Sequence, residues 1–267
     1  MRSNKLRKLL KENKPTIGTR VFSTWPGIIE MIGHTGIVDY IELLGEYTPW
    51  DLYDLENIAR ATELFDMSSM IKIDQNAKEF IAQRALGSGI QNVLFTDIRS
   101  VEDAKRCVDI VKPETPEIKG INGSHCRRNV GYGIEGGSLN YVNAMNDAVI
   151  ALMIEKKGAI DQLGEIASIK GVDMLQFGPS DYSLSIGRVG QKKHPDVKEA
   201  ELKMIKTAVN LGIRPRVELG SIHINMDEIK KYIDLGVKDF NLPHDTVIIY
   251  KWIKENGENL REILSRL

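Results

Sequence analysis

The sequence predicts an α/β protein that folds as a single (β/α)8 barrel, the TIM barrel. Short β-branched apolar runs alternate with longer amphipathic segments, and the alternation continues almost to the C-terminus. Eight such runs, most of them followed by a helical pattern, occupy a chain of 267 residues. A doubly wound open sheet usually has fewer strands, so the barrel is favoured and residues 1–267 are expected to form one domain.

Each element of the barrel is predicted from its own pattern. The predicted strands are residues 16–22, 39–44, 69–73, 92–95, 149–154, 173–177, 214–219 and 239–242. The predicted helices are residues 25–34, 52–63, 77–86, 101–111, 158–169, 197–211, 226–235 and 245–267. Several helices end in a glycine, as in ALGSGIQNVLF and ASIKGVDMLQF, which is a natural helix cap before the next strand. The N-terminal run KLRKLLKENK predicts an amphipathic helix that caps the barrel floor.

One stretch interrupts this rhythm, at about residues 113–146. Glycines recur there with basic and polar residues between them, as in GINGSHCRRNVGYGIEGGSLN. This composition is more typical of a long functional loop than of a barrel helix. On this loop, Arg127 and Arg128 could bind an acidic tail of a substrate, such as a phosphate or a sulfonate, or could instead serve a subunit contact.

Composition and charge exclude several classes of protein. The 36 Lys+Arg and 37 Asp+Glu give a net charge of −1, and the two signs are interspersed, which disfavours a nucleic-acid partner. The two cysteines, Cys107 and Cys126, have no CxxC partner and predict free thiols in a reducing compartment. The chain shows no secretory signal and no run of about 18 apolar residues, so we expect a cytoplasmic protein with no membrane partner.

In such a barrel the chemistry lies where the strands end, and acidic residues predominate at those positions. Glu155 and Asp181 follow neighbouring strands and could converge on a hard divalent cation such as Mg²⁺ or Mn²⁺. Gly178 and Pro179 predict a tight turn before a helix whose first N–H groups, at Ser180 and Asp181, could hold a substrate carboxylate. Exposed carboxylates at strand ends are common, so Glu155 and Asp181 could instead have no role in metal binding. A helix start needs a cap in any case, so the turn at residues 178–181 could be purely structural.

The phrases around these residues resemble those of one family, the metal-dependent class II pyruvate aldolases of the HpcH/HpaI aldolase and citrate lyase group. KGVDMLQFGPSDYS, at residues 170–183, resembles the family phrase EGVDxxxxGPxDLS. LMIE, ending at Glu155, is similar to VQIE, and LGEYTP, at residues 44–49, is similar to DGEHxP. QKKHPDV at residues 191–197 and HDTVII at residues 244–249 resemble GxxHPxV and VDTTLL. The resemblance covers nearly the whole chain, and its GPxD segment is the most specific part.

The resemblance implies an aldolase, an aldehyde-lyase that forms or cleaves a carbon–carbon bond through the enolate of pyruvate or another 2-oxo acid. It implies a divalent metal, Mg²⁺ or Mn²⁺ or else Co²⁺, on Glu155 and Asp181, where it would stabilise charge that develops on the 2-oxo oxygen. The substrates would be a 2-oxo acid and an aldehyde. The family also implies a homo-oligomer, a trimer or hexamer, in which the last helix packs on a neighbour.

Three positions depart from the family pattern. The histidine of GEH is Tyr47 here, the acidic residue that orients it is Leu44, and the arginine of the third strand is Lys72. A lysine supplies a point charge without the bidentate contact of a guanidinium, and a tyrosine with a pKa of about 10 is a poor base near neutrality. Either Tyr47 takes over proton transfer, or His125 on the glycine-rich loop replaces the base, or the reaction has changed. Glu46 is retained and could hydrogen-bond a metal-bound water or serve the structure alone.

We therefore expect Tyr47, Lys72 and Glu46 to be the catalytic residues, and Gly178, Pro179, Ser180 and Arg127 to bind the substrate. The competing hypothesis is a non-catalytic or repurposed barrel that keeps its metal and binds a 2-oxo acid, or a different lyase of the same superfamily. The loss of both the histidine and the arginine is what keeps this alternative open.

Overall fold

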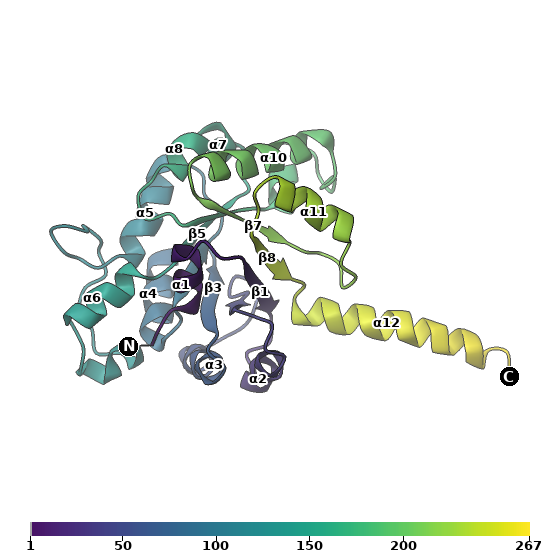
Figure 1. Ribbon diagram of the computed structural model, residues 1–267, viewed down its shortest axis with the longest axis horizontal. Helices are drawn as coiled ribbons and strands as arrows, with labels where there is room; N and C mark the ends of the chain where they lie inside the picture. Colours follow the sequence, from purple (N-terminus) through teal and green to yellow (C-terminus); the bar gives the residue numbers. More distant parts are fainter. Residues whose placement is uncertain (1) are drawn as a thin grey trace.

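Eight parallel strands close into a barrel in chain order, and each strand pairs with the next and the last with the first (Figure 1). The structure is a computed structural model and describes residues 2–267. The strands are β1 Thr16–Val21, β2 Tyr40–Leu43, β3 Ser68–Ile73, β4 Asn92–Phe95, β5 Ile150–Ile154, β6 Met174–Phe177, β7 Arg214–Glu218 and β8 Asp239–Leu242. The predicted fold is confirmed, and each predicted strand end lies within one residue of the observed end.

Helices surround the barrel. They are α1 Lys5–Lys11, α2 Pro26–His34, α3 Leu52–Leu64, α4 Lys78–Ser88, α5 Val101–Val111, η1 Arg128–Gly133, α6 Leu139–Asn146, α7 Lys157–Asp161, α8 Leu163–Ala167, α9 Pro179–Ser185, α10 Pro195–Asn210, α11 Met226–Asp234 and α12 Asp245–Leu264. The single helix predicted over residues 158–169 was wrong, because Gln162 leaves the helical conformation (φ −106°, ψ 18°) and separates α7 from α8. The glycine caps are confirmed: Gly89, Gly171, Gly212 and Gly236 all have positive φ.

The glycine-rich stretch is a loop only in its first part. The prediction of a loop was wrong for residues 139–146, which form α6. Ser138 caps this helix by accepting a hydrogen bond from the Tyr141 N–H at 3.1 Å, and Tyr141 and Met145, four residues apart, are both buried in the core. The glycines before Ser138 hide this apolar spacing in the sequence.

The strands place alternate side chains inside and outside the barrel. On β2, Ile41 and Leu43 pack outward against the helices, whereas Tyr40 belongs to a second apolar cluster inside the barrel. Leu6 of α1 is fully buried in this inner cluster, and Arg7 binds Asp173 through two bonds of 2.6 Å. The prediction that the N-terminal run caps the barrel floor is confirmed, although the helix ends at Lys11.

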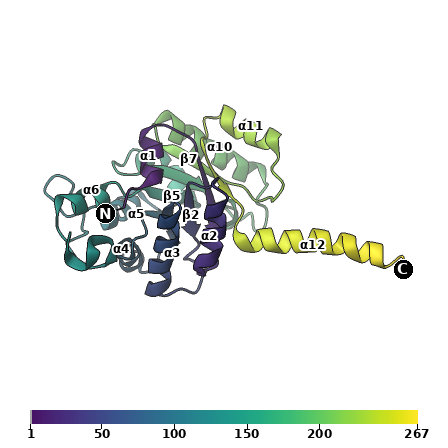
Figure 2. The same cartoon turned by 60° about the horizontal axis from the view of Figure 1, so that its bottom comes forward.

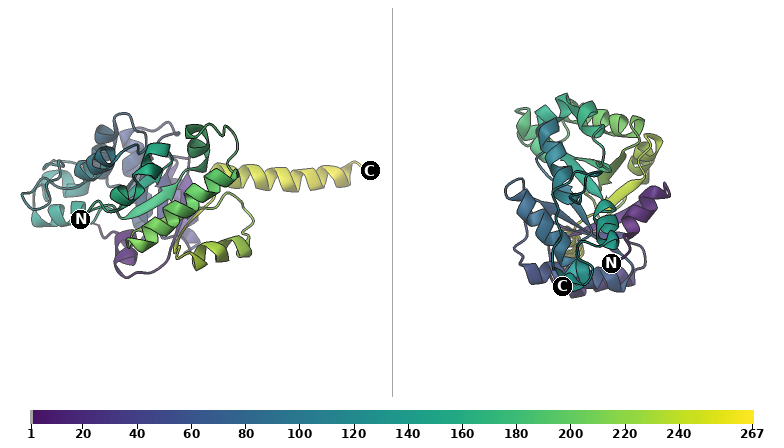
Figure 3. Two further views of the ribbon diagram at one scale, coloured as in Figure 1. Left: turned by 90° about the horizontal axis from the view of Figure 1, so that it is seen from above. Right: turned by 90° about the vertical axis from the view of Figure 1, so that its left-hand side faces the viewer.

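The molecule is elongated along one direction. Residues near the N-terminus and α6 lie at one end, whereas α12 projects from the other end and stands clear of the barrel (Figures 1, 2 and 3). Since α12 begins directly after β8, it leaves from the side of the barrel where the strands end. Among residues 2–267, none of the helices combines the length and the apolar character that a membrane span requires.

Candidate active site

A cluster of carboxylates gathers at the mouth of the barrel, where β4, β5 and β6 end. Glu155 follows β5 and is only 4% exposed, and its Oε1 accepts a hydrogen bond of 2.8 Å from the Asp97 backbone N–H. Its Oε2 lies so close to the backbone of Gly178 that a Cβ there would stand 2.3 Å away. Burial, together with the nearby Asp181 and Asp97, raises the pKa of Glu155 to about 7. Because a side chain at position 178 would collide with Glu155, the turn after β6 needs a glycine there.

A lysine also enters this cluster. Lys156 directly follows Glu155, and its Nζ lies 2.5 Å from Asp97 Oδ1 and 3.4 Å from Asp181 Oδ1. Its side chain is 16% exposed. This cluster thus contains the carboxylates of Asp97, Glu155 and Asp181 together with the ammonium of Lys156.

A second group of polar residues lies where β2 and β3 end. Lys72 projects into the barrel from β3, is 5% exposed, and donates a hydrogen bond of 2.7 Å to Tyr47 Oη. The same Nζ lies 2.8 Å from Glu46 Oε2. Burial acts to lower the pKa of Lys72, but Tyr47 and the Glu46 carboxylate outweigh it and raise the pKa above its ordinary value. Tyr47 is 53% exposed, and the partial burial of its hydroxyl end raises its pKa to about 12, so its phenol is protonated at neutral pH.

These two groups act on one another. The Lys72 ammonium acts to lower the pKa of Glu155, against the effect of burial, and both residues stand at the carboxyl ends of strands of one closed parallel barrel. The structure therefore brings Tyr47, Lys72, Glu46 and Glu155 together at one mouth, as the sequence predicted.

Aromatic and basic residues complete the rim beside β1 and β8. The Phe22 ring packs on the Tyr47 ring on one side and on the His244 ring on the other, with centroids 6.1 and 5.0 Å apart. His244 caps α12 through Nδ1, which accepts from the Val247 N–H at 3.2 Å. Burial and the nearby Arg20 lower the pKa of His244, so its imidazole is neutral at pH 7.

The turn after β6 opens α9 with Pro179 at its first position, and Gly178 supplies no side-chain cap. The first amides of α9 are therefore not used by a capping side chain, as the GPSD phrase predicted. Asp181 stands in this first turn with its side chain 44% exposed. The predicted helix start is confirmed, and its use for a substrate carboxylate stays a prediction.

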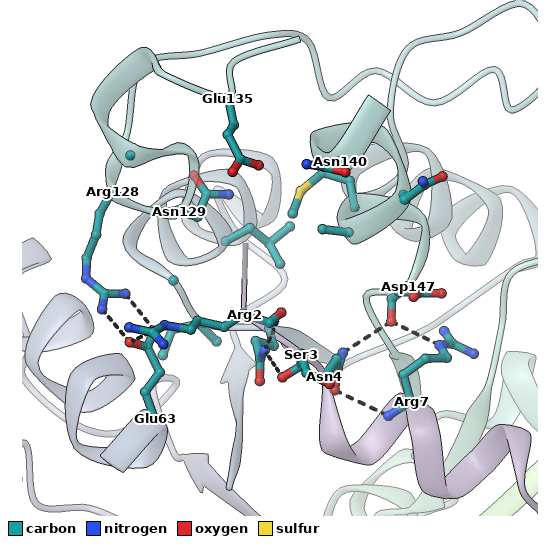
Figure 4. Close-up of a pocket in the computed structure, with 18 of the residues that line it drawn as sticks. Arg2, Ser3, Asn4, Arg7, Glu63, Arg128, Asn129, Glu135, Asn140 and Asp147 are labelled. Carbon is teal, nitrogen blue, oxygen red and sulfur yellow. Dashed lines mark hydrogen bonds and ion pairs between the residues drawn. The ribbon is translucent and has the colours of Figure 1, made fainter. Parts of the chain in front are cut away.

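The structure does not bring Arg127 or His125 to this mouth. Arg127 Nη1 donates to the Gln83 carbonyl at 2.7 Å, and the His125 ring packs on Tyr141 of α6, 5.3 Å between centroids. Both belong to the segment that borders α1, at the barrel floor. A groove of about 1250 Å³ lies there, and Figure 4 shows Arg128 on its wall, paired with Glu63 through two bonds of 3.0 and 2.8 Å.

Sequence reasoning missed Lys156 and Arg20. Lys156 could have been identified from the sequence, because it directly follows Glu155 at the end of a predicted strand and therefore lies at the barrel mouth. Arg20 lies at an inward position of β1, and its Nη1 binds Glu218 Oε2 at 2.8 Å, but a basic residue within an apolar run gives no sign of which face it takes.

Glu155 and Asp181 are the two residues of this site that would hold a divalent cation. Within residues 2–267, no three His, Cys, Asp or Glu side chains converge as a complete metal site. Glu155 and Asp181 are oxygen ligands of the kind that Mg²⁺ and Mn²⁺ prefer, and these ions commonly take their other ligands from water and substrate. A cation beside Glu155 would also favour its ionised form against the effect of burial.

Comparison with known proteins gives one consistent result. The model of the HpcH/HpaI aldolase/citrate lyase family matches residues 39–247. A hydroxypyruvate/pyruvate aldolase of Paraburkholderia phytofirmans is 25% identical over 264 residues, 97% of this chain and 98% of that protein. A 2-dehydro-3,6-dideoxy-6-sulfogluconate aldolase of Pseudomonas putida is 30% identical over 191 residues, 71% of this chain and 72% of that protein. The crystal structure of a protein of this family from Burkholderia cenocepacia superposes with a TM-score of 0.85 at 22% identity, over 97% of this chain and 100% of that one.

Proposed function

The chain belongs to the HpcH/HpaI aldolase/citrate lyase family, and on this premise we propose that it forms or cleaves a carbon–carbon bond through the enolate of pyruvate or another 2-oxo acid. It is a carbon–carbon lyase of the aldolase type, as are its curated relatives. Its second substrate is an aldehyde, and the reaction depends on a divalent cation, Mg²⁺, Mn²⁺ or Co²⁺. The family resemblance given by the sequence motifs agrees with this assignment.

The observation that carries the proposal is that the buried ammonium of Lys72 and the buried carboxylate of Glu155 lie at the same barrel mouth. When a 2-oxo acid becomes an enolate, negative charge develops on its keto oxygen, and catalysis requires positive charge or hydrogen-bond donors at that point. Lys72 is charged at neutral pH, buried, and held in place by Glu46 at 2.8 Å. In this proposal its ammonium stabilises this oxygen.

Glu155 and Asp181 hold the divalent cation in this proposal. The bound cation supplies Lewis-acid polarisation of the carboxylate and keto oxygens of the substrate. The first amides of α9, at Ser180 and Asp181, hold the substrate carboxylate, and the turn at Gly178 and Pro179 aims them.

Tyr47 acts as a hydrogen-bond donor rather than as a base. Its phenol keeps its proton because burial raises its pKa to about 12, and Lys72 donates to its oxygen at 2.7 Å. The hydroxyl hydrogen is then available to a substrate oxygen. In this proposal the proton acceptor is the Glu46 carboxylate, which lies on the same ammonium as Tyr47, because a phenol that keeps its proton cannot accept one.

Exchange of the methyl protons of pyruvate with D2O, followed by NMR, tests the proposal. We expect exchange with Mg²⁺, Mn²⁺ or Co²⁺ and its loss in Glu155→Ala and Asp181→Ala, while Asp161→Ala, on the surface of α7, keeps it. Exchange that persists in both Glu155→Ala and Asp181→Ala would contradict the proposed metal site. Pyruvate binding without exchange in the wild type would support the competing hypothesis of a binding barrel without catalysis.

The projecting helix supports the further proposal that the chain forms a homo-oligomer, a trimer or hexamer. In α12 only Asp245 is buried, and Ile249, Tyr250, Trp252 and Ile253 are each more than half exposed. Such an apolar surface on a helix of 20 residues is stable in water when another copy covers it. Light scattering coupled to size-exclusion chromatography should show an oligomer that Trp252→Glu with Ile249→Glu breaks into smaller species; a wild-type monomer would contradict this.

Thiol chemistry supports a cytoplasmic site of action. Cys107 and Cys126 are both free, as expected for a protein that works in a reducing compartment. Fractionation of cells that produce the protein tests this, and its recovery outside the cytoplasmic fraction would contradict it.

A further inference from the structure

Two consecutive lysines at the end of β5 point in different directions. Lys156 turns into the mouth, where its Nζ lies 2.5 Å from Asp97 Oδ1 and 3.4 Å from Asp181 Oδ1. Lys157 points outward, is 62% exposed, and binds Asp161 Oδ2 at 2.6 Å, four residues along the same helix. Lys156 is the extended residue before α7 (φ −124°, ψ 144°), and its two ion pairs show that its long side chain reaches the carboxylates of the mouth.

The ammonium of Lys156 and a divalent cation require the same oxygens. Asp181 is one of the two protein ligands proposed for the cation, and Lys156 already contacts it. Asp97, the nearer partner of Lys156, also binds Glu155 through its backbone N–H at 2.8 Å, so the ammonium contacts one proposed ligand and the residue that holds the other. Two cations this close repel each other, and the repulsion is strong because the side chain of Lys156 is largely buried.

We propose that Lys156 is a resident cation of the carboxylate cluster and that a divalent ion binds Glu155 and Asp181 only after the ammonium has withdrawn from Asp181. Lys156 thus sets the metal affinity of the site. It is a positioning residue, since it acts on the carboxylates and not on the substrate. This inference rests on the metal site of the proposed function.

Asp97 can keep the ammonium of Lys156 after it leaves Asp181. Asp97 Oδ1 is at 2.5 Å and Asp181 Oδ1 at 3.4 Å, so Lys156 keeps its closer partner when it gives up the farther one. Withdrawal therefore does not leave a buried charge without a partner, and the site passes from one cation to the other without unfolding.

Calorimetric titration with Mn²⁺ tests this without any activity measurement. We expect Lys156→Met to bind Mn²⁺ at least about tenfold more tightly than the wild type, a change that corresponds to one ion-pair contribution. Lys156→Arg keeps the charge and should not bind more tightly. Lys157→Met is the matched control and should leave the affinity unchanged, because its ammonium is on the surface and paired with Asp161. Thermal unfolding of each variant checks that it is folded.

The outcomes separate this inference from the proposed function. If wild type and Lys156→Met bind Mn²⁺ with equal affinity, and Glu155→Ala abolishes binding in both, the metal site stands and the role of Lys156 is overturned. Weaker binding by Lys156→Met overturns it as well, since the lysine would then support the site. If no variant binds Mn²⁺, the metal site itself is overturned, and the inference with it.

Discussion

Replacing Glu42 by glutamine tests the charged layer inside the barrel. Glu42 of β2 and Arg216 of β7 are both 0% exposed at their side chains and lie 2.6 Å apart, Oε2 to Nη1. Arg216 also donates from Nε to Gln176 Oε1 at 2.6 Å. In Glu42→Gln the guanidinium of Arg216 keeps its charge in the barrel interior but loses its carboxylate partner at 2.6 Å.

The expected loss follows from this burial. Removing one partner of a buried ion pair costs about 3–5 kcal/mol, because the other charge is left uncompensated. At about 2.1 cal/mol/K per residue, the 267 residues have an unfolding entropy of about 0.56 kcal/mol/K near the midpoint, so the melting temperature should fall by about 5–9 °C. The matched control is Glu56→Gln, which breaks an exposed ion pair with Arg60 at 2.7 Å. This change should shift the melting temperature by less than about 2 °C.

Thermal unfolding by circular dichroism at one fixed protein concentration measures both variants. The double variant Glu42→Leu with Arg216→Met removes both charges and should recover at least half of the loss, since an apolar pair avoids the desolvation of two ions. A fall of less than about 2 °C in Glu42→Gln would refute the reasoning, because it would mean that water reaches Arg216. A double variant less stable than Glu42→Gln would refute it as well.

Three further predictions concern single positions. Gly178→Ala should abolish pyruvate exchange and lower the melting temperature by about 2–5 °C, because its Cβ would displace the buried Glu155 side chain at a cost of about 1–3 kcal/mol; full activity would contradict this. Burial lowers the pKa of Lys112 to about 8 from its ordinary 10.5, so the unfolded chain binds more protons between these values and stability should rise with pH across this window. Urea unfolding should show that rise reduced in Lys112→Met, and an equal rise in both would count against it. Burial raises the pKa of Cys107 to about 12, whereas Cys126 is exposed, so a thiol reagent should label Cys126 rapidly and Cys107 only after unfolding; two fast thiols would disprove this.

Local patterns were enough to predict the strands, the glycine caps and the strand-end carboxylates. The end of a strand can be predicted from the change from apolar to polar residues. Glycines such as Gly89 and Gly236 predict the end of a helix, because few other residues adopt positive φ without strain. Because all eight strands are parallel, their carboxyl ends meet at one edge. That is why Tyr47, Lys72 and Glu155 could be assigned to one site before their contacts were known.

Prediction from local patterns failed for the segment that was interpreted from its amino-acid composition and not from its apolar periodicity. Residues 113–146 suggested a functional loop because glycine and arginine are frequent there, but neither type of residue specifies which end of a barrel a segment covers. The backbone carbonyl of Gln83 and the carboxylate of Glu63 hold Arg127 and Arg128 at the floor, and both come from helices far away in the sequence.

The sequence by itself determined that this chain is a barrel, where its strands lie and which residues stand at their ends, because those properties depend on neighbours within a few positions. Only the tertiary structure decided which of them meet. Glu42 and Arg216 become an ion pair because closure of the barrel brings β2 and β7 to one interior. Lys156 enters the carboxylate cluster while Lys157 stays outside, because the turn after β5 sends adjacent side chains to opposite faces.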